Sequence, residues 1–178
     1  MNALVATEPK VGGEAQYLTF VLGGEMFAMD ILGIKEIIEY GNLTTVPMMP
    51  AFVRGVINLR GAVVPVVDLA VRFGRPSTPI NKRSCIVILE VHGEEGVQDI
   101  GVLVDAVSAV LSIAAADIEP APSFGGGIRA DFIGGMAKVD GRFVIVLSVE
   151  RVLSVEEMAQ LSQAGDGRAP VREGEFAQ

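Results

Sequence analysis

Short apolar runs, rich in Val, Ile and Leu, recur along the chain and are separated by turn-forming residues. Such runs, bounded by Gly, Pro, Asn or Asp, are typical of strands. Gly23-Gly24 and Asp140-Gly141 are two-residue hairpin signals, because these turns need positive φ angles. The run 34–40 also fits a helix, but its short length and β-branched content favour a strand. The sequence predicts strands over residues 17–22, 25–31, 34–40, 55–58, 62–67, 85–91, 100–104, 107–113, 133–139 and 143–149.

Helical signals are few and brief. Residues 68–73 predict a single helical turn that ends at Gly74. Ser154 and Glu157 have capping-box spacing, in which the Ser hydroxyl accepts from the backbone of Glu157 and the Glu side chain reaches back. A final helix is therefore expected to begin at Ser154. Residues 1–15 are expected to be flexible because this segment is polar and contains Gly, and residues 164–178 are expected to be disordered because they are rich in Gly and charge.

The two halves of the chain follow one plan, which indicates an internal repeat. In each half an Asp ends a strand, an apolar strand follows, and a pair of prolines precedes a Gly and a hairpin. On this alignment Asp30 corresponds to Asp105, and Gly55 corresponds to Gly134. Repeats of this size indicate duplicated supersecondary units. Each unit has about five short strands, which suits a small closed barrel whose interior is filled by side chains.

Composition restricts the function classes further. The 178 residues carry a net charge of −8, which argues against a general nucleic-acid binder. Apolar stretches are interrupted well before about 18 residues, so no segment is expected to insert into a membrane. A single cysteine cannot form an internal disulfide, and the cytoplasm is the expected compartment. Residues 54–83 hold six basic side chains and one acid, whereas residues 84–128 hold seven acids and no Lys or Arg. This asymmetry fits either ordinary solvated surface or complementary faces that steer partners.

No set of residues with catalytic or metal-binding character is found. His92 is the only histidine and is expected on the surface, and Cys85 lies in an apolar strand. Asp30, Asp68 and Asp105 each follow an apolar strand and are expected to cap turns or helices. We therefore predict a protein that is not an enzyme and has no cofactor. A small ligand-binding barrel is the main alternative, although the lack of Trp disfavours it, and a carboxylate-based hydrolase is a weaker one.

The hairpin over residues 55–69 is the most informative segment. Two apolar arms, a Gly-containing turn and a Pro account for most of it, but they do not account for Arg60 at the turn. An Arg can make planar, two-point contacts to a carboxylate, which makes this side chain a candidate recognition group. With this hairpin, the segment from Asp30 to Ile37 and the run 101–105, the chain resembles the CheW-type chemotaxis coupling proteins over about residues 16–161.

The resemblance implies an all-β fold of two intertwined five-stranded SH3-like barrels with short helical turns and a C-terminal helix. It implies a CheW-like domain over residues 16–163, with barrel subdomains at roughly 31–85 and 105–150 plus swapped edge strands. It also implies a scaffold that joins the regulatory domain of a CheA histidine kinase to chemoreceptor cytoplasmic tips, and that contacts its own kind in rings. No receiver segment is expected after Leu161 and no kinase segment before Gln16, so a stand-alone coupling protein is expected.

The same resemblance assigns candidate site residues. Glu36 and Arg60 match a pair of opposite charge near the receptor-binding surface, and Ile34 and Val110 match positions of partner contact. The remaining matches are motif residues of the hairpin, namely Gly55, Asn58 and Gly61. Ile34 and Val110 also fit plain core positions, and Gly55 also fits a backbone bend. Glu36 is expected to point outward, because it is a charge in an otherwise Ile-rich strand.

Overall fold

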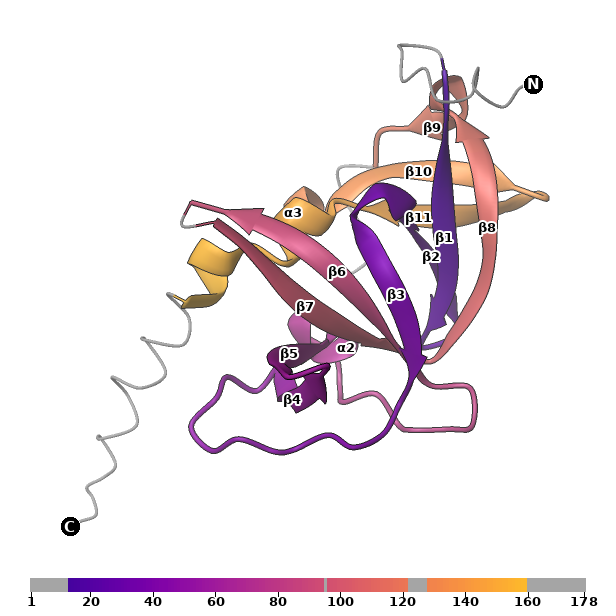
Figure 1. Ribbon diagram of the computed structural model, residues 1–178. Coiled ribbons are helices and arrows are strands. Elements are labelled where there is room, and N and C mark those ends of the chain that lie inside the picture. Colours follow the sequence, from indigo (N-terminus) through magenta and orange to yellow (C-terminus); the bar gives the residue numbers. More distant parts are fainter. Residues whose placement is uncertain (1–12, 95, 122–127, 160–178) are drawn as a thin grey trace.

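The computed structural model describes residues 13–94, 96–121 and 128–159, and it consists mainly of strands arranged in two sheets (Figure 1). Most of the segments expected to be flexible or disordered lie outside these residues. Glu14 and Ala15 are an exception, because they already belong to the first strand, which begins two residues before the expected start of the domain. No helix in the described part of the chain is long and apolar enough to cross a membrane.

The first barrel is a five-stranded sheet built from one continuous stretch of chain. The strand order is β3 (Ile34–Glu39), β6 (Cys85–Gly93), β7 (Gly96–Val104), β5 (Ala62–Asp68) and β4 (Val53–Leu59). Neighbouring strands are antiparallel except for β5 and β7, which are parallel. A bridge between Thr44, which follows the edge strand β3, and Val56 on the opposite edge strand β4 closes the sheet into a barrel.

The second barrel combines the start of the chain with its second half. The short strand β9 follows the edge strand β8 and pairs with β10 on the other edge, so this sheet closes as the first one does. The strand order is β8 (Ala106–Ala114), β1 (Glu14–Leu22), β2 (Glu25–Asp30), β11 (Arg142–Leu147), β10 (Ile133–Val139) and β9 (Ile118–Glu119). The prediction of an all-β fold of two intertwined SH3-like barrels is confirmed.

The exchanged strands differ from the expectation in their position. They were expected at the sheet edges, but β1 and β2 lie inside the second sheet, between β8 and β11. Likewise β6 and β7 lie inside the first sheet, which therefore extends to Val104 rather than to about residue 85. Central strands make hydrogen bonds on both sides, so the second barrel cannot form without the segment 14–30, and the first cannot form without the segment 85–104.

The repeat is real, but one of its expected matches is wrong by one residue. Gly55 pairs with Val66 after a bulge in β4, and Gly135 pairs with Val146 after the same bulge in β10. Gly55 therefore corresponds to Gly135 and not to Gly134. A Cβ atom on Gly55 would overlap the carbonyl oxygen of Thr44, and one on Gly135 would overlap the Ile118 side chain. Both glycines are needed because the segment that closes each barrel passes close to this point.

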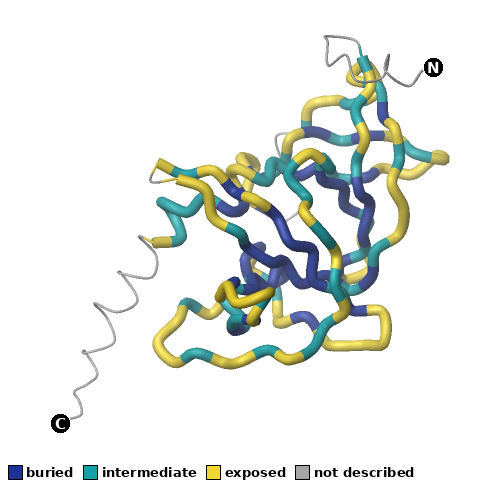
Figure 2. Tube along the Cα trace, in the orientation of Figure 1, coloured by how far each residue is buried: buried dark blue, intermediate teal, exposed yellow. Residues whose placement is uncertain are grey.

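Three apolar cores hold the fold together, and the alternation of side chains along the strands explains them. One core fills each barrel: Ile86 and Ile88 point into the first and Ala28 into the second. The third and largest core lies between the barrels. A chain of four Phe rings with centroids about 6 Å apart passes through it: Phe20, Phe27, Phe73 and Phe132. Figure 2 shows the buried residues concentrated where the two sheets meet.

Short helical elements connect the strands. The predicted turn after β5 is confirmed as α2 (Leu69–Arg72), and the expected strand 143–149 ends at Leu147 because α3 (Val149–Val152) follows. Three 3-10 turns are also present in the described part of the chain: η1 (Ile31–Gly33), η2 (Ala115–Asp117) and η3 (Ala130–Phe132). The helix expected at Ser154 runs over residues 155–159 as far as the structure describes it, and the Ser154 hydroxyl accepts from the Glu157 N–H at 3.2 Å.

Candidate functional site

The site is built on the tip of the β4–β5 hairpin, where Arg60 and Gly61 form a two-residue turn. Their φ angles are +52° and +89°, so both lie in the left-handed region that this turn type requires. Gly adopts this conformation freely, and the Asn58 side chain accepts a hydrogen bond from the Gly61 N–H at 2.9 Å. Arg60 has neither advantage, because its Cβ atom makes the left-handed conformation unfavourable. A long cation at such a position suggests a functional role for its side chain.

Arg60 forms an ion pair with Glu36 of β3. Its Nη1 donates to Glu36 Oε1 at 3.5 Å, and its Nη2 donates to Glu36 Oε2. The Arg60 side chain is 70% exposed and that of Glu36 is 30% exposed, so the pair lies on the surface. The hydrogen bond from Arg60 lowers the pKa of Glu36, and the same bond raises the pKa of Arg60. Beside them, Lys35 Nζ lies 3.1 Å from Asp99 Oδ2.

Of the other candidate residues, Ile34 lies two positions before Glu36 on β3 and packs partly against the core between the barrels. Val110 lies on β8 in the other sheet, where it pairs with Leu18, and it is 52% exposed. The alternative that Val110 is a core residue is therefore wrong. The structure thus brings Glu36 and Arg60 into contact, with Ile34 on the same strand, and places Val110 on a different barrel.

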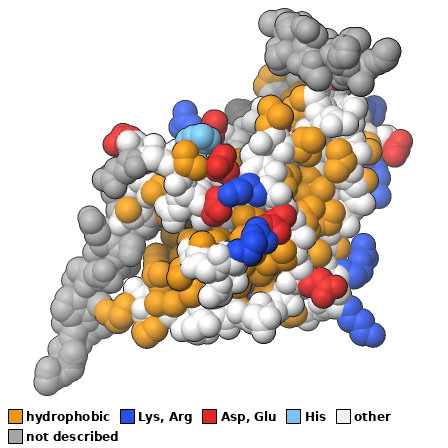
Figure 3. Space-filling model, viewed as in Figure 1, with side chains coloured by type: hydrophobic (Ala, Val, Ile, Leu, Met, Phe, Trp, Pro, Cys, Tyr) orange, Lys and Arg blue, Asp and Glu red, His pale blue; other side chains and the backbone are white. Residues whose placement is uncertain are grey.

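Exposed apolar side chains accompany the ion pair. Val63, three residues after Arg60 on the hairpin, is 71% exposed. Ile37 is also exposed, but its side chain points to the opposite face of β3 from that of Glu36. In the space-filling view, oppositely charged side chains meet in the middle of a face on which many apolar side chains reach the surface (Figure 3). A charged pair flanked by exposed apolar groups is typical of a surface that binds another protein.

Two clusters, each with an arginine paired to a carboxylate, were not anticipated from the sequence. In the first, Asp68 is fully buried and accepts four hydrogen bonds, from Arg54 Nη1 at 2.8 Å, the Thr78 hydroxyl at 2.7 Å, the Thr78 N–H at 3.0 Å and the Ala70 N–H at 3.1 Å. The predicted helix-capping role of Asp68 is thus confirmed as one part of a larger network that ties the loop after α2 to the barrel.

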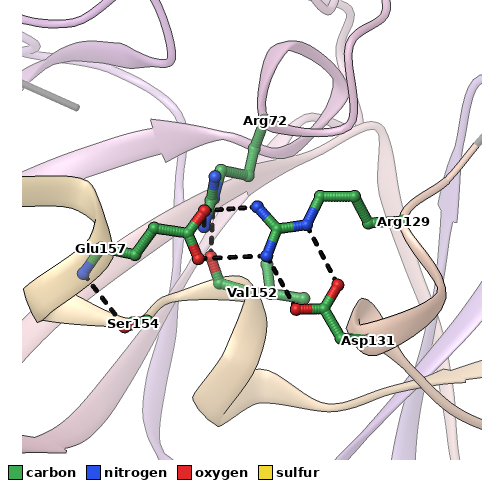
Figure 4. A network of polar contacts seen from close by, with 6 residues as sticks. All are labelled: Arg72, Arg129, Asp131, Val152, Ser154 and Glu157. Atoms are coloured by element: carbon green, nitrogen blue, oxygen red, sulfur yellow. Dashed lines mark hydrogen bonds and ion pairs between the residues drawn. The ribbon is translucent and has the colours of Figure 1, made fainter. Parts of the chain in front are cut away.

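The second cluster joins the C-terminal helix to both barrels (Figure 4). The Glu157 carboxylate lies between two guanidinium groups, bonded to Arg129 and 3.5 Å from Arg72 Nη2. The Arg72 guanidinium packs against the rings of Phe52 and Phe132 and donates to the backbone, and the Arg129 guanidinium also lies over the Phe132 ring. Glu157 therefore does not reach back to complete the expected capping box. The signal that could have revealed this cluster is an Arg inside the apolar run 69–73.

The residues weighed for chemistry have structural positions. Asp30 caps the turn after β2 through the Leu32 N–H, which confirms its predicted role. Asp105 instead accepts from the Gly23 N–H in the β1–β2 turn, which is distant in the sequence. His92 is exposed, and burial raises the pKa of the Cys85 thiol. Among the described residues, no cluster of His, Cys, Asp and Glu could hold a metal ion. The apolar filling of each barrel gives no support to the ligand-binding alternative.

Known proteins similar to this chain are named as chemotaxis or scaffolding proteins. The chain is 36% identical over 158 residues to the chemotaxis protein CheW of Klebsiella aerogenes, covering 87% of this chain and 93% of the relative. It is 32% identical over 152 residues to the chemotaxis protein CheW of Rhizobium meliloti, covering 85% and 96%. The crystal structure of the scaffolding protein TtCheW from Thermoanaerobacter tengcongensis superposes with a TM-score of 0.70 at 35% identity, covering 78% of this chain and 91% of that one. Residues 16–157 match the CheW-like domain model, and the chain belongs to the CheW-like domain family.

Proposed function

We propose that this chain is a non-catalytic adaptor that couples the cytoplasmic tips of chemoreceptors to a CheA-type histidine kinase in chemotaxis signalling. The observation that carries the proposal is the membership of the CheW-like domain family, whose named relatives are chemotaxis and scaffolding proteins. The protein would act in the cytoplasm, next to receptor arrays at the inner membrane, and would bind the regulatory domain of the kinase. Contacts between copies of the chain would extend such assemblies into rings.

The Glu36–Arg60 pair is the proposed centre of the receptor contact. The pair is exposed, it is held by a defined hairpin, and it is bordered by apolar side chains that a helical receptor tip could cover. Ile34 would support this surface from the same strand, and Gly55, Asn58 and Gly61 would fix the hairpin backbone. Val110 would extend the contact on the second barrel. A single contact of this kind has modest affinity, and simultaneous binding to several partners in an array would strengthen it.

The test is co-sedimentation of the purified full chain with receptor signalling tips and kinase. Arg60→Glu should weaken receptor binding by about tenfold or more, because it places two carboxylates side by side at the contact. Folding should be unchanged, since Arg and Glu face the same backbone constraint at this turn position. Lys82→Glu is the matched control, because it makes the same charge change in an exposed loop. The double variant Glu36→Arg with Arg60→Glu restores the ion pair with its two charges exchanged. Normal receptor binding by this variant would show that the contact needs only an intact ion pair, and weakened binding would show that it needs Arg at position 60 and Glu at position 36.

Two outcomes would contradict the proposal. If the unmodified chain did not sediment with receptor tips and kinase together, the coupling function would be wrong. If Arg60→Glu lowered the melting temperature strongly while Lys82→Glu did not, Arg60 would be a structural residue, and the receptor contact would have to be sought elsewhere.

A further inference from the structure

The two barrels carry the same hairpin with opposite charges at the tip. Arg60 in the first barrel and Asp140 in the second occupy the first turn position, with φ angles of +52° and +51°. Gly61 and Gly141 occupy the second position, with φ angles of +89° and +79°. The backbones therefore present the side chains of Arg60 and Asp140 in equivalent places, at the mouths of their barrels.

The edge strands next to these hairpins are also equivalent. β3 has a one-residue bulge at Lys35, after which Glu36 pairs with the neighbouring strand. β8 has a one-residue bulge at Ser108, after which Ala109 pairs with its neighbouring strand. Ala109 therefore stands where the first barrel has Glu36. The ion pair that covers the mouth of the first barrel is replaced in the second by a methyl group and a lone carboxylate.

A pocket of about 220 Å³ lies at this place in the second barrel. Its walls are mostly apolar and belong to β1, β2, β8 and the β10–β11 hairpin, and its volume suits one long side chain rather than a cofactor, which needs about 300 Å³ or more. Among the described residues, Asp140 has no ion-pair partner. The lining includes Met26, Ala109, Leu111, Asp140, Arg142 and Val144.

We propose that this pocket binds an arginine side chain presented by a loop of the kinase regulatory domain, with the guanidinium paired to Asp140. The partner's arginine would form an ion pair with a carboxylate across the interface between two proteins, as Arg60 does with Glu36 within the first barrel. The assignment rests on the proposed function and names a kinase contact at the mouth of the second barrel. Val110 belongs to the proposed receptor contact, and because it lies between Ala109 and Leu111 on β8, its side chain faces away from this pocket.

The chemistry of the pocket selects an arginine over other side chains. The methylene groups of an arginine match the apolar walls formed by Met26, Leu111 and Val144, while its planar head can contact both oxygens of a carboxylate. Arg142 is the nearest competing cation, because it also lines the pocket, two residues after Asp140. In the first barrel that position is Ala62, so Arg142 has no counterpart there and its charge should weaken rather than create the contact.

The main experiment fills the pocket with larger side chains of this chain, so that a partner's side chain can no longer enter. The double variant Ala109→Glu with Asp140→Arg transfers the ion pair of the first barrel to the second, and Arg60 shows that an Arg is tolerated at this φ angle. Asp140→Asn is a milder variant, and it should fold at least as well as the parent because Asn-Gly is a favoured pair in this turn. Each full-length variant is titrated separately with the purified kinase regulatory domain and with the receptor tip.

We expect the double variant to bind the kinase domain at least about a hundredfold more weakly and Asp140→Asn about tenfold more weakly, as is usual when one partner of an interface ion pair is lost. Arg142→Ala should bind the kinase domain more tightly. Receptor binding should be unchanged in all three variants. Unchanged kinase binding in the double variant and in Asp140→Asn would overturn the proposal, as would a loss confined to the receptor tip. Failure of the parent chain to bind either partner would instead refute the coupling function itself.

Discussion

Removing the Asp68 carboxylate should cost far more stability than removing an exposed polar side chain. Asp68→Ala takes the acceptor from four donors at once, and it leaves the Arg54 guanidinium and Thr78, which is itself buried, without their main partner. Breaking a buried ion pair from one side costs about 3–5 kcal/mol. For a domain of this size, each kcal/mol shifts the melting temperature by about 2–4 °C, so a decrease of about 6–20 °C is expected.

The repeat supplies the control for this prediction. Ser148, directly after β11, corresponds in the repeat to Asp68 at the end of β5, but its side chain makes no capping hydrogen bond. Ser148→Ala should therefore shift the free energy of unfolding by less than about 0.5 kcal/mol, as is usual for a change away from a network. Urea unfolding followed by far-UV circular dichroism is the assay, because the chain contains no Trp. If the two variants lost similar stability, the Asp68 network would not be the reason that the loop after α2 is held in place.

Two further predictions test the barrel closure and the C-terminal helix. Gly55→Ala and Gly135→Ala should each lower the free energy of unfolding by about 1–3 kcal/mol, because the added Cβ would overlap the closing segment, whereas Gly41→Ala, with open space around it, should be neutral in the same urea assay. Arg129 lowers the pKa of Glu157 from its ordinary value of 4.5, so this carboxylate stabilises the fold above pH 4.5 and loses that effect as the pH falls through the lowered pKa. Glu157→Gln should therefore melt at a lower temperature than the parent at pH 7, with the difference shrinking below pH 4.5; a difference independent of pH would contradict this assignment.

Local features of the fold were predictable because they depend on residues adjacent in the chain. The turns at Gly23-Gly24 and Asp140-Gly141 follow from the positive φ angles that two-residue hairpins require, and the helical turn at α2 follows from the cap at Asp68. The placement of β1 and β2 inside the second sheet could not be deduced in this way. Their partners β8 and β11 lie about 80–120 residues further along the chain, and no short-range pattern specifies such a pairing.

In the candidate site, too, the features that depend on neighbouring residues were predictable, and those that depend on distant ones were not. Arg60 stood out because it is a long cation at a turn between two apolar arms, and that signal is local. Its partner Glu36 was assigned through resemblance alone, since the register between β3 and the hairpin is a property of the closed barrel. Arg54 and Arg72 were missed because each reaches a partner through a long side chain, Arg54 to Asp68 and Arg72 to the C-terminal helix.

A repeated fold gives a coupling protein a specific problem, because two similar barrels tend to bind similar partners, whereas coupling requires two different ones. Under the proposed assignment of the receptor to the first barrel and the kinase to the second, the two barrels differ at positions where the backbone tolerates change. Gly55 and Gly61 keep their identity in the second barrel because close packing and positive φ demand it. Arg60 and Glu36 are replaced, because the tip of a hairpin and the rim of an edge strand face the solvent. Changing these two side chains alters charge and shape at the barrel mouth without altering the barrel, which is the least disruptive way to make two equivalent surfaces recognise different proteins.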